Sequence, residues 1–254
     1  MTPLSLTFYL GSALVPVADR LAASIGERLG TVVEFDPDAT DSERRAAIDD
    51  PKPGFVWLCG LDTVLRQQDG RLGASIIGAP VFPGRERPVY DSVIVASDRW
   101  SGPGVADFEG GVLAINQPES WSGHHAVRAL LQTRGLRRPM FRRFVVTGSH
   151  EASIDTLLAG DADCAAIDDT VWQARVARDP QAAALRIVDR TDAWPAPPFS
   201  LVDGLAPDLA ADARKAILDV TVPGLEAIAP ASDADYAVFH DGLAASRALP
   251  WSSP

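Results

Sequence analysis

The stretch GVLAINQPESWSG, residues 111–123, indicates the fold class of this chain. Its first half is an apolar run typical of a buried strand, and its second half opens the helix-like segment SGHHAVRALLQTRG, residues 122–135. The same order recurs downstream in RRFVVTGS at 142–149, HEASIDTLLAGD at 150–161 and DCAAIDD at 163–169. This alternation predicts an α/β fold, with a mostly parallel sheet covered by helices on both faces.

Short strands and helices alternate before this region as well, which predicts two α/β units rather than one. The segment YDSVIVASD at 90–98 is a candidate crossing between two sheets, and the proline-rich AWPAPPFSLVDG at 193–204 indicates an extended return. We predict one lobe formed by residues 1–92 and 193–254, and a second lobe formed by residues 93–192. Two sheets joined by crossing strands would leave a cleft that suits a ligand.

The composition narrows the classes of partner. A formal net charge of −11 repels nucleic acid and anionic lipid, and no apolar run is long enough to span a bilayer. The segment MTPLSLTFYLGS lacks the features of a signal peptide, so we expect a cytoplasmic protein, or a periplasmic one whose export signal has been removed. We expect Cys59 and Cys164 to be free thiols in different lobes.

The first candidate site is the turn before the helix at residue 122. Ser120 and Ser122 can donate hydroxyl hydrogen bonds, and the amides of a helix's first turn attract anions, including the amide of Trp121. Small residues in this turn would let an oxyanion approach. The alternative is a plain helix cap, because serine is a preferred capping residue.

Two further candidates follow the next strands. Ser149 and His150 stand at the start of the helix-like segment after RRFVV. His150 is a candidate hydrogen-bond donor to an anion, a candidate general base, or a surface residue. Asp168 ends the strand CAAI, at the edge where α/β folds bind ligands. Its alternative role is helix capping.

Several chemical signatures are missing from the sequence. It contains no phosphate-binding P-loop, no GxGxxG after a strand and no GxSxG elbow. His124 and His125 are adjacent, so on a helix they point about 100° apart and make a poor metal pair. We therefore expect no catalytic residue, no metal and no cofactor.

Taken in order, these motifs resemble the phosphate/phosphite/phosphonate-binding proteins of ABC importers. The resemblance rests on four segments: YDSVIV at 90–95, SWSG at 120–123, TGSHEAS at 147–153, and residues 160–168. It implies a two-lobed type II periplasmic-binding-protein fold with a hinge and an interlobe cleft. It also implies that Ser120, the turn at Trp121, Ser122 and His150 grip the anion, together with Tyr90 from the hinge.

This resemblance implies a monomeric solute-binding protein that closes on phosphate, phosphite or a phosphonate and docks on an ABC permease, without catalysis. Trp121 departs from the threonine frequent in the family, and Pro195–Pro198 lacks a carboxylate that holds aminoalkylphosphonates, although Asp168 remains. The alternative is a cytoplasmic enzyme or sensor on the same fold that acts on a small anionic metabolite. In an enzyme, His150 with Asp168 or Asp169 would serve as base and orienter.

Overall fold

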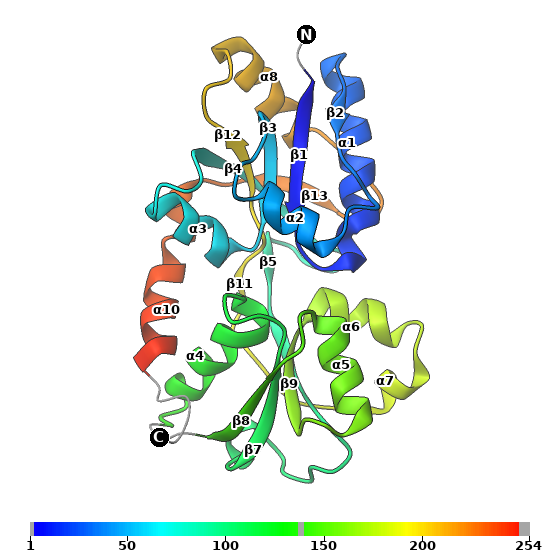
Figure 1. The fold of residues 1–254 in the computed structure, drawn as a ribbon, viewed down its shortest axis with the longest axis vertical. Helices are drawn as coiled ribbons and strands as arrows, with labels where there is room; N and C mark the ends of the chain where they lie inside the picture. Colours follow the sequence, from blue (N-terminus) through cyan, green and yellow to red (C-terminus); the bar gives the residue numbers. More distant parts are fainter. Residues whose placement is uncertain (1–2, 137–139, 249–254) are drawn as a thin grey trace. The chain divides into compact units, whose positions relative to one another are not determined.

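The computed structural model describes residues 3–136 and 140–248 and divides the chain into two compact units (Figure 1). Unit 1 comprises Met1–Val89 and Pro195–Ala237, and unit 2 comprises Tyr90–Trp194 and Val238–Pro254. The chain thus passes from one unit to the other after residues 89, 194 and 237. A short two-stranded ladder, β5 (Val89–Tyr90) with β11 (Trp194–Pro195), is formed where the chain makes two of these passages.

Unit 1 is built on a six-stranded sheet flanked by helices. The strand order is β13 (Ala227–Pro230), β4 (Ala74–Val81), β12 (Phe199–Val202), β3 (Gly54–Leu58), β1 (Leu4–Tyr9), β2 (Val33–Glu34). The other elements of the unit are η1 (Ser12–Leu14), α1 (Val15–Leu29), α2 (Asp41–Ala47), α3 (Gly60–Gln68), α8 (Pro207–Leu218) and α9 (Asp233–Tyr236). The three strands β1, β2 and β3 are parallel, whereas β12 runs antiparallel to both β3 and β4.

Local sequence accounts for the ends of these helices. In α1, the residues Val17, Leu21 and Ile25 recur with helical spacing and are buried, and the helix ends where Gly30 adopts a left-handed φ of 63°. At the start of α2, Thr40 and Glu43 cap each other's backbone in a reciprocal capping box.

Unit 2 is built on a five-stranded sheet. The strand order is β10 (Arg186–Arg190), β6 (Ser92–Ala96), β9 (Cys164–Asp168), β7 (Gly111–Ile115), β8 (Phe141–Val146). The other elements are η2 (Val105–Asp107), η3 (Trp121–His125), α4 (Ala126–Thr133), α5 (His150–Ala159), α6 (Asp169–Val176), α7 (Pro180–Ala184) and α10 (Val238–Ala248). The expectation of a mostly parallel sheet is wrong: β7 runs parallel to both β8 and β9, but β6 runs antiparallel to β9 and to β10, because the chain returns through the two extended crossing segments.

Alternate residues of the central strands β6, β7 and β9 of unit 2 are buried on opposite faces of the sheet. Leu113 and Ile115 pack with residues of α4 on one face, while Val112 and Ala114 pack with residues of α5 and α6 on the other. Figure 1 shows α4 on one side of this sheet and α5, α6 and α7 on the other. The expectation of a sheet covered on both faces is therefore confirmed for unit 2.

The end of the chain differs from the expected division. The sequence placed all of residues 193–254 with the first lobe, and residues 249–254 of that range lie outside the described residues. The structure assigns Pro195–Ala237 to unit 1, but α10 packs on α4 in unit 2 (Figure 1). The reason is that the buried side of α10, with Phe239 and Leu243, completes the core next to Trp121.

Two cysteine expectations are confirmed. Cys59 lies in unit 1 and Cys164 in unit 2, and both are free thiols. Cys164 is fully buried, and burial raises the pKa of its thiol well above its ordinary value. Cys164 is therefore a core residue rather than a reactive group.

Candidate functional site

One edge of the sheet in unit 2 collects all the predicted ligand-binding residues. The parallel strands β7 and β8 end together, where Ile115 pairs with Val146, and the end of β9 meets the start of β6, where Asp168 pairs with Ser92. Tyr90 precedes β6, and the two predicted helix starts follow β7 and β8. In α/β sheets, ligands bind at the edge where the parallel strands end.

The first helix start combines a serine cap with one turn of π-helix. Ser120 is the cap, and its Oγ accepts a hydrogen bond of 3.2 Å from the amide of Gly123. The amide of His125 then donates to the carbonyl of Ser120, five residues back, at 3.1 Å. Such π-turns are frequent at functional sites, and the first amides of the helix have no partner within it. The capping role considered for Ser120 is thus present.

Trp121 contributes its backbone to this edge but not its ring. The indole is only 1% exposed and packs against Trp194 and Phe239, with ring centroids 4.1 and 5.0 Å away. Gly242 of α10 permits this packing, because a Cβ there would lie 2.4 Å from the Trp121 ring and 2.5 Å from the Trp194 ring. The ring therefore belongs to the core of unit 2.

The second helix start is also capped by serine. Ser149 Oγ accepts a hydrogen bond of 3.1 Å from the amide of Ala152. Thr147 Oγ1 donates to the carbonyl of Ile115 at 3.1 Å, and the amide of Gly148 donates to the carbonyl of Asn116 at 2.8 Å. These bonds hold the start of α5 against the loop that follows β7.

The two helix starts meet at His150. Its Nε2 lies 2.9 Å from Ser122 Oγ and 3.3 Å from Asn116 Nδ2. Gly123 makes room for this contact, because a Cβ there would lie 2.0 Å from Asn116 Oδ1 and 3.0 Å from His150 Cε1. Ser122 and His150, which sequence reasoning proposed separately, therefore belong to one hydrogen-bonded group.

Asn116 is a site residue to which the sequence analysis gave no role. Its side chain is largely buried, with Oδ1 accepting from the amide of Gln117 at 2.8 Å and Nδ2 facing His150. The available signal was its position, since it is the first polar residue after the apolar strand β7.

Burial governs the charge state of His150. It lowers the pKa of His150 to about 4, against a smaller raising effect of the Ala166 backbone carbonyl. The imidazole is therefore neutral at neutral pH. An anion at this edge would meet a neutral ring rather than an imidazolium.

Asp168 acts as a helix cap. Its Oδ1 accepts hydrogen bonds from the Thr170 amide at 2.8 Å and the Thr170 hydroxyl at 2.6 Å. Burial raises the pKa of Asp168 to about 6, although these hydrogen bonds lower it. The capping alternative for Asp168 is thus observed. Tyr90, nearby on β5, is 2% exposed.

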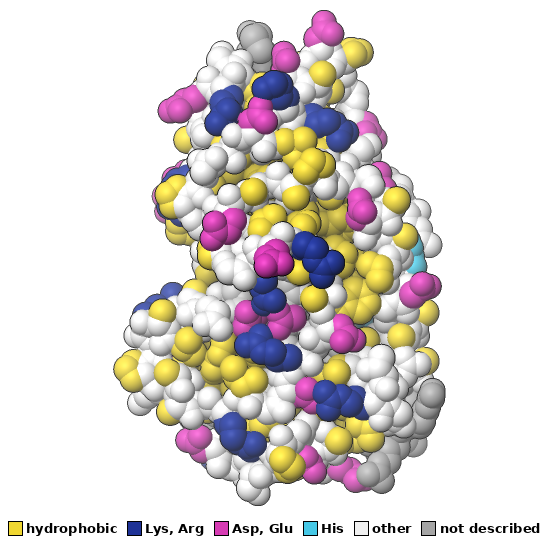
Figure 2. All heavy atoms as spheres, turned by 180° about the vertical axis from the view of Figure 1, so that it is seen from behind, with side chains coloured by type: hydrophobic (Ala, Val, Ile, Leu, Met, Phe, Trp, Pro, Cys, Tyr) yellow, Lys and Arg dark blue, Asp and Glu magenta, His cyan; other side chains and the backbone are white. Residues whose placement is uncertain are grey.

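Two arginine side chains of unit 2, those of Arg175 and Arg190, are engaged with carboxylates. Arg190 contacts Asp91 at 2.7 Å and Asp169 at 3.0 Å. Arg175 contacts Glu151 at 2.8 Å and Asp179 at 2.9 Å. Figure 2 likewise shows basic and acidic side chains interspersed over the face it displays. Among these described pairs, each guanidinium lies beside more than one carboxylate.

His124 and His125 are buried structural residues. The two rings stack with centroids 4.4 Å apart, and His125 Nδ1 lies 2.8 Å from Ser246 Oγ of α10. Among the described residues, no group of three or more His, Cys, Asp or Glu side chains is placed to hold a metal ion. Burial lowers the pKa of His125 to about 3.

We expect His125 to make unit 2 less stable in acid. The folded-state pKa of His125 lies below the unfolded value of about 6.5. Between about pH 6.5 and pH 3 the unfolded chain therefore binds more protons, and the stability of the fold decreases as the pH is lowered. His125→Gln should reduce the slope of unfolding free energy against pH by up to about 1.4 kcal/mol per pH unit. Urea unfolding across this range measures the slope, and an unchanged slope would contradict the expectation.

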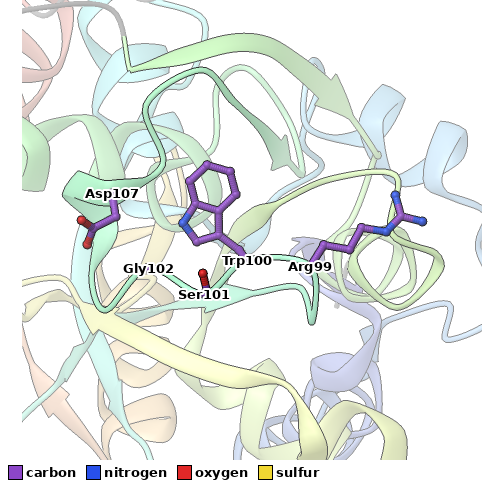
Figure 3. A pocket seen from close by; sticks show the side chains of 5 residues that line it. All are labelled: Arg99, Trp100, Ser101, Gly102 and Asp107. Carbon is purple, nitrogen blue, oxygen red and sulfur yellow. The ribbon is translucent and has the colours of Figure 1, made fainter.

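A cavity of about 390 Å³ lies at the other end of this sheet (Figure 3). Its lining residues follow β6 or precede β7, and they are Arg99, Trp100, Ser101, Gly102 and Asp107. Figure 3 shows the Arg99 side chain directed away from the ring of Trp100. The Arg99 guanidinium donates to the Gly160 carbonyl at 2.6 Å, and Asp107 accepts from the Gly104 amide at 2.9 Å. Both charged groups thus serve local structure.

Comparison with known proteins identifies the family. Residues 6–237 match the family described as the periplasmic substrate-binding protein of phosphonate ABC transporters. The chain belongs to this family. It is therefore a solute-binding protein, as the sequence predicted. No curated protein matches the chain by sequence.

Solved structures agree with the family in their fold. PhnD1 from Prochlorococcus marinus in complex with methylphosphonate is 14% identical, with a TM-score of 0.79 over 97% of this chain and 98% of that one. A phosphonate-transporter binding protein from Pseudomonas aeruginosa is 13% identical, with a TM-score of 0.75 over 96% and 86%. The sulphonate-binding protein SsuA from Escherichia coli is 15% identical, with a TM-score of 0.61 over 98% and 76%. The predicted α/β periplasmic-binding-protein fold is confirmed.

The members of this family are described as periplasmic substrate-binding proteins. Within the described ranges, no helix is both long and apolar enough to cross a membrane.

Proposed function

We propose that this chain binds a tetrahedral oxyanion, such as a phosphonate, phosphite or phosphate, at the edge of unit 2 where β7, β8 and β9 end. The observation that carries the proposal is the hydrogen bond of 2.9 Å between Ser122 and His150, which joins two helix starts into one group. Helix starts supply amide donors and positive partial charge, so they hold anions without a basic side chain. We assign Ser120, Trp121, Ser122, Ser149, His150, Tyr90 and Asp168 to this site.

These residues would divide the tasks of the site among them. The amides of Trp121 and Ser122 would contact the anion, while Ser120 and Ser149 would hold the two helix starts through their caps. Tyr90 and Asp168 would border the site at the ends of β5 and β9. We further propose that the protein acts as a monomer in the periplasm and delivers its ligand to an ABC permease.

One contact favours the rival enzymatic function. Ser122 and His150 have the separation of a nucleophile and its base. However, the pKa of about 4 makes His150 a weak base, and Asp168, expected as its orienter, bonds Thr170 instead. These features favour binding without chemistry. Release of a cleaved product from any bound compound would support the enzyme instead.

A thermal-shift screen tests the proposed ligand class. A ligand at about 100 times its dissociation constant adds about 2.7 kcal/mol of stability. For a chain of this size, the melting temperature should rise by about 5–10 °C. We expect this shift with phosphonates, phosphite or phosphate and not with carboxylates. Equal responses to all anions, or to none, would contradict the proposal.

We expect Ser122→Ala to weaken binding about 10- to 100-fold, because a hydrogen bond to a charged group contributes about 1.5–3 kcal/mol. Ser246→Ala is the matched control, since it also removes a buried serine bonded to a histidine, in the same unit but on α10. Calorimetric titration with methylphosphonate should show a loss in the first variant only. Equal affinities in both variants would remove Ser122 from the site.

A further inference from the structure

The orientation of one amide fixes the hydrogen-bond directions in this site. Asn116 Oδ1 accepts from the backbone amide of Gln117 at 2.8 Å, which leaves Nδ2 on the side of His150, 3.3 Å from Nε2. A side-chain NH₂ group can only donate. Nε2 of His150 must therefore act as an acceptor and carry no proton.

The other ring nitrogen then carries the proton. The neutral imidazole has one N–H, and the surroundings of His150 lower its pKa, so the second proton is absent at neutral pH. Nδ1 is buried, and no described atom completes a hydrogen bond of ordinary geometry with it. The backbone of Ala166 raises the pKa of His150, as an accepting carbonyl does, and because Nε2 faces Ser122 and Asn116 we assign this carbonyl to the side of Nδ1. An N–H at Nδ1 suits that neighbour, whereas a lone pair would be repelled.

This tautomer sets the direction of the Ser122 hydroxyl. Ser122 Oγ lies 2.9 Å from the unprotonated Nε2, so its single hydrogen points to His150. The remaining groups on Oγ are lone pairs. Toward any ligand, Ser122 is then an acceptor, although the backbone amides of the same turn remain donors.

We infer that Asn116 sets the tautomer of His150 and thereby makes Ser122 a hydrogen-bond acceptor toward the ligand, so that the site selects oxyanions that carry a proton. This inference rests on the proposed function. The preferred species is the monoanion of a phosphonate or phosphate, with two oxygens on the amides and its P–OH donating to Ser122. Sulfonates and phosphoryl dianions, which have no hydroxyl proton, leave the Ser122 lone pairs facing an anionic oxygen.

The effect of other titratable groups on the pH dependence of binding must be distinguished from the effect of the ligand's own proton. Asp168, at the end of the neighbouring strand β9, has a pKa of about 6 and would also repel an anion as it ionises. The charged and titratable side chains on the surrounding elements include Asp91, Glu151, Asp155, Asp169, Arg175, Arg178 and Arg190, which form ion pairs, together with Glu119, Arg128, His124 and His125.

The test measures dissociation constants by calorimetry for two phosphonates across pH. A phosphoryl group loses its second proton near neutrality, at about pH 6 for a phosphate monoester. Methylphosphonate should bind with constant affinity below its second pKa and lose about tenfold per pH unit above it. With chloromethylphosphonate, whose electron-withdrawing substituent lowers this pKa, the inflection should move to lower pH. Methanesulfonate, of the same shape, should bind at least about tenfold more weakly than methylphosphonate.

The possible results separate the inference from the proposed function. An affinity that stays constant or rises above the second pKa would overturn the inference while binding itself remains. An inflection that is the same for both phosphonates and disappears in Asp168→Asn would assign the effect to Asp168, which also overturns it. Failure of every phosphonate to bind at any pH would instead contradict the proposed function.

Two variants test the roles of the individual residues. In nitrogen-15 NMR spectra, His150 should show the Nδ1–H tautomer, and Asn116→Ala should shift the signals toward the Nε2–H form. A protonated Nε2 in the unaltered protein would overturn the inference without any variant. Ser122→Ala should flatten the pH profile above the ligand's second pKa, since the acceptor is gone. A profile that keeps its full slope in this variant also overturns it.

Discussion

Replacing Trp121 with alanine is expected to lower the free energy of unfolding by about 3–5 kcal/mol, as is usual for buried tryptophans. This is a large share of a domain's total stability, which is about 5–15 kcal/mol. The loss is large because the ring fills the space between Trp194 and Phe239, and Gly242 cannot fill the cavity left behind. Urea unfolding measures the change.

Two further substitutions test this explanation. Trp121→Phe keeps much of the ring and removes an indole N–H that is buried without a hydrogen-bond partner among the described residues, so it should lose less than half as much. Trp100→Ala, at a partly exposed ring stacked on Phe108, should also lose less. Equal losses at residues 100 and 121 would argue against the packing explanation.

Gly123→Ala should destabilise unit 2 by about 1–3 kcal/mol, the usual effect of forcing a methyl group into a packed position. The added Cβ would lie 2.0 Å from Asn116 Oδ1 and 3.0 Å from His150 Cε1, so both side chains must shift away from the new methyl group. Because both belong to the proposed site, methylphosphonate affinity should fall about tenfold or more.

Gly104→Ala is the matched control for this substitution. The same added atom at residue 104 meets only Asp107 Oδ2, at an ordinary 3.7 Å, and the backbone φ of −149° accepts alanine. Calorimetric titration and urea unfolding of both variants should show the losses at residue 123 alone. Unchanged affinity in Gly123→Ala would show that the contact between Asn116 and His150 does not support binding.

Local sequence was sufficient to place most of the candidate site. Serine before a helix, polar residues after an apolar strand and the alternation of strands and helices are short-range signals, and they brought Ser120, Ser149 and Asp168 to one edge. The same signals could not choose between capping and ligand binding. The structure shows that all three side chains cap helices, which leaves ligand contact by them a proposal.

Features that depend on distant segments could not be predicted in the same way. Nothing in the sequence indicates where the Trp121 ring packs, because its partners are residues 194 and 239, far along the chain. The place of α10 depends on that same contact. Asn116 acquires its role only through His150, 34 residues later. No pattern within a single strand or helix reports such pairings.

The position of β12 bears on the order in which the protein can fold during synthesis. This strand lies between β3 and β4, yet residues 82–198 separate it from the end of β4. At about 5–20 residues per second, the ribosome needs about 6–23 s to make that interval. All five strands of the unit 2 sheet, from Ser92 to Arg190, emerge within it. The unit begun second can thus complete its sheet first, while the nascent β3 and β4 wait for the strand that joins them.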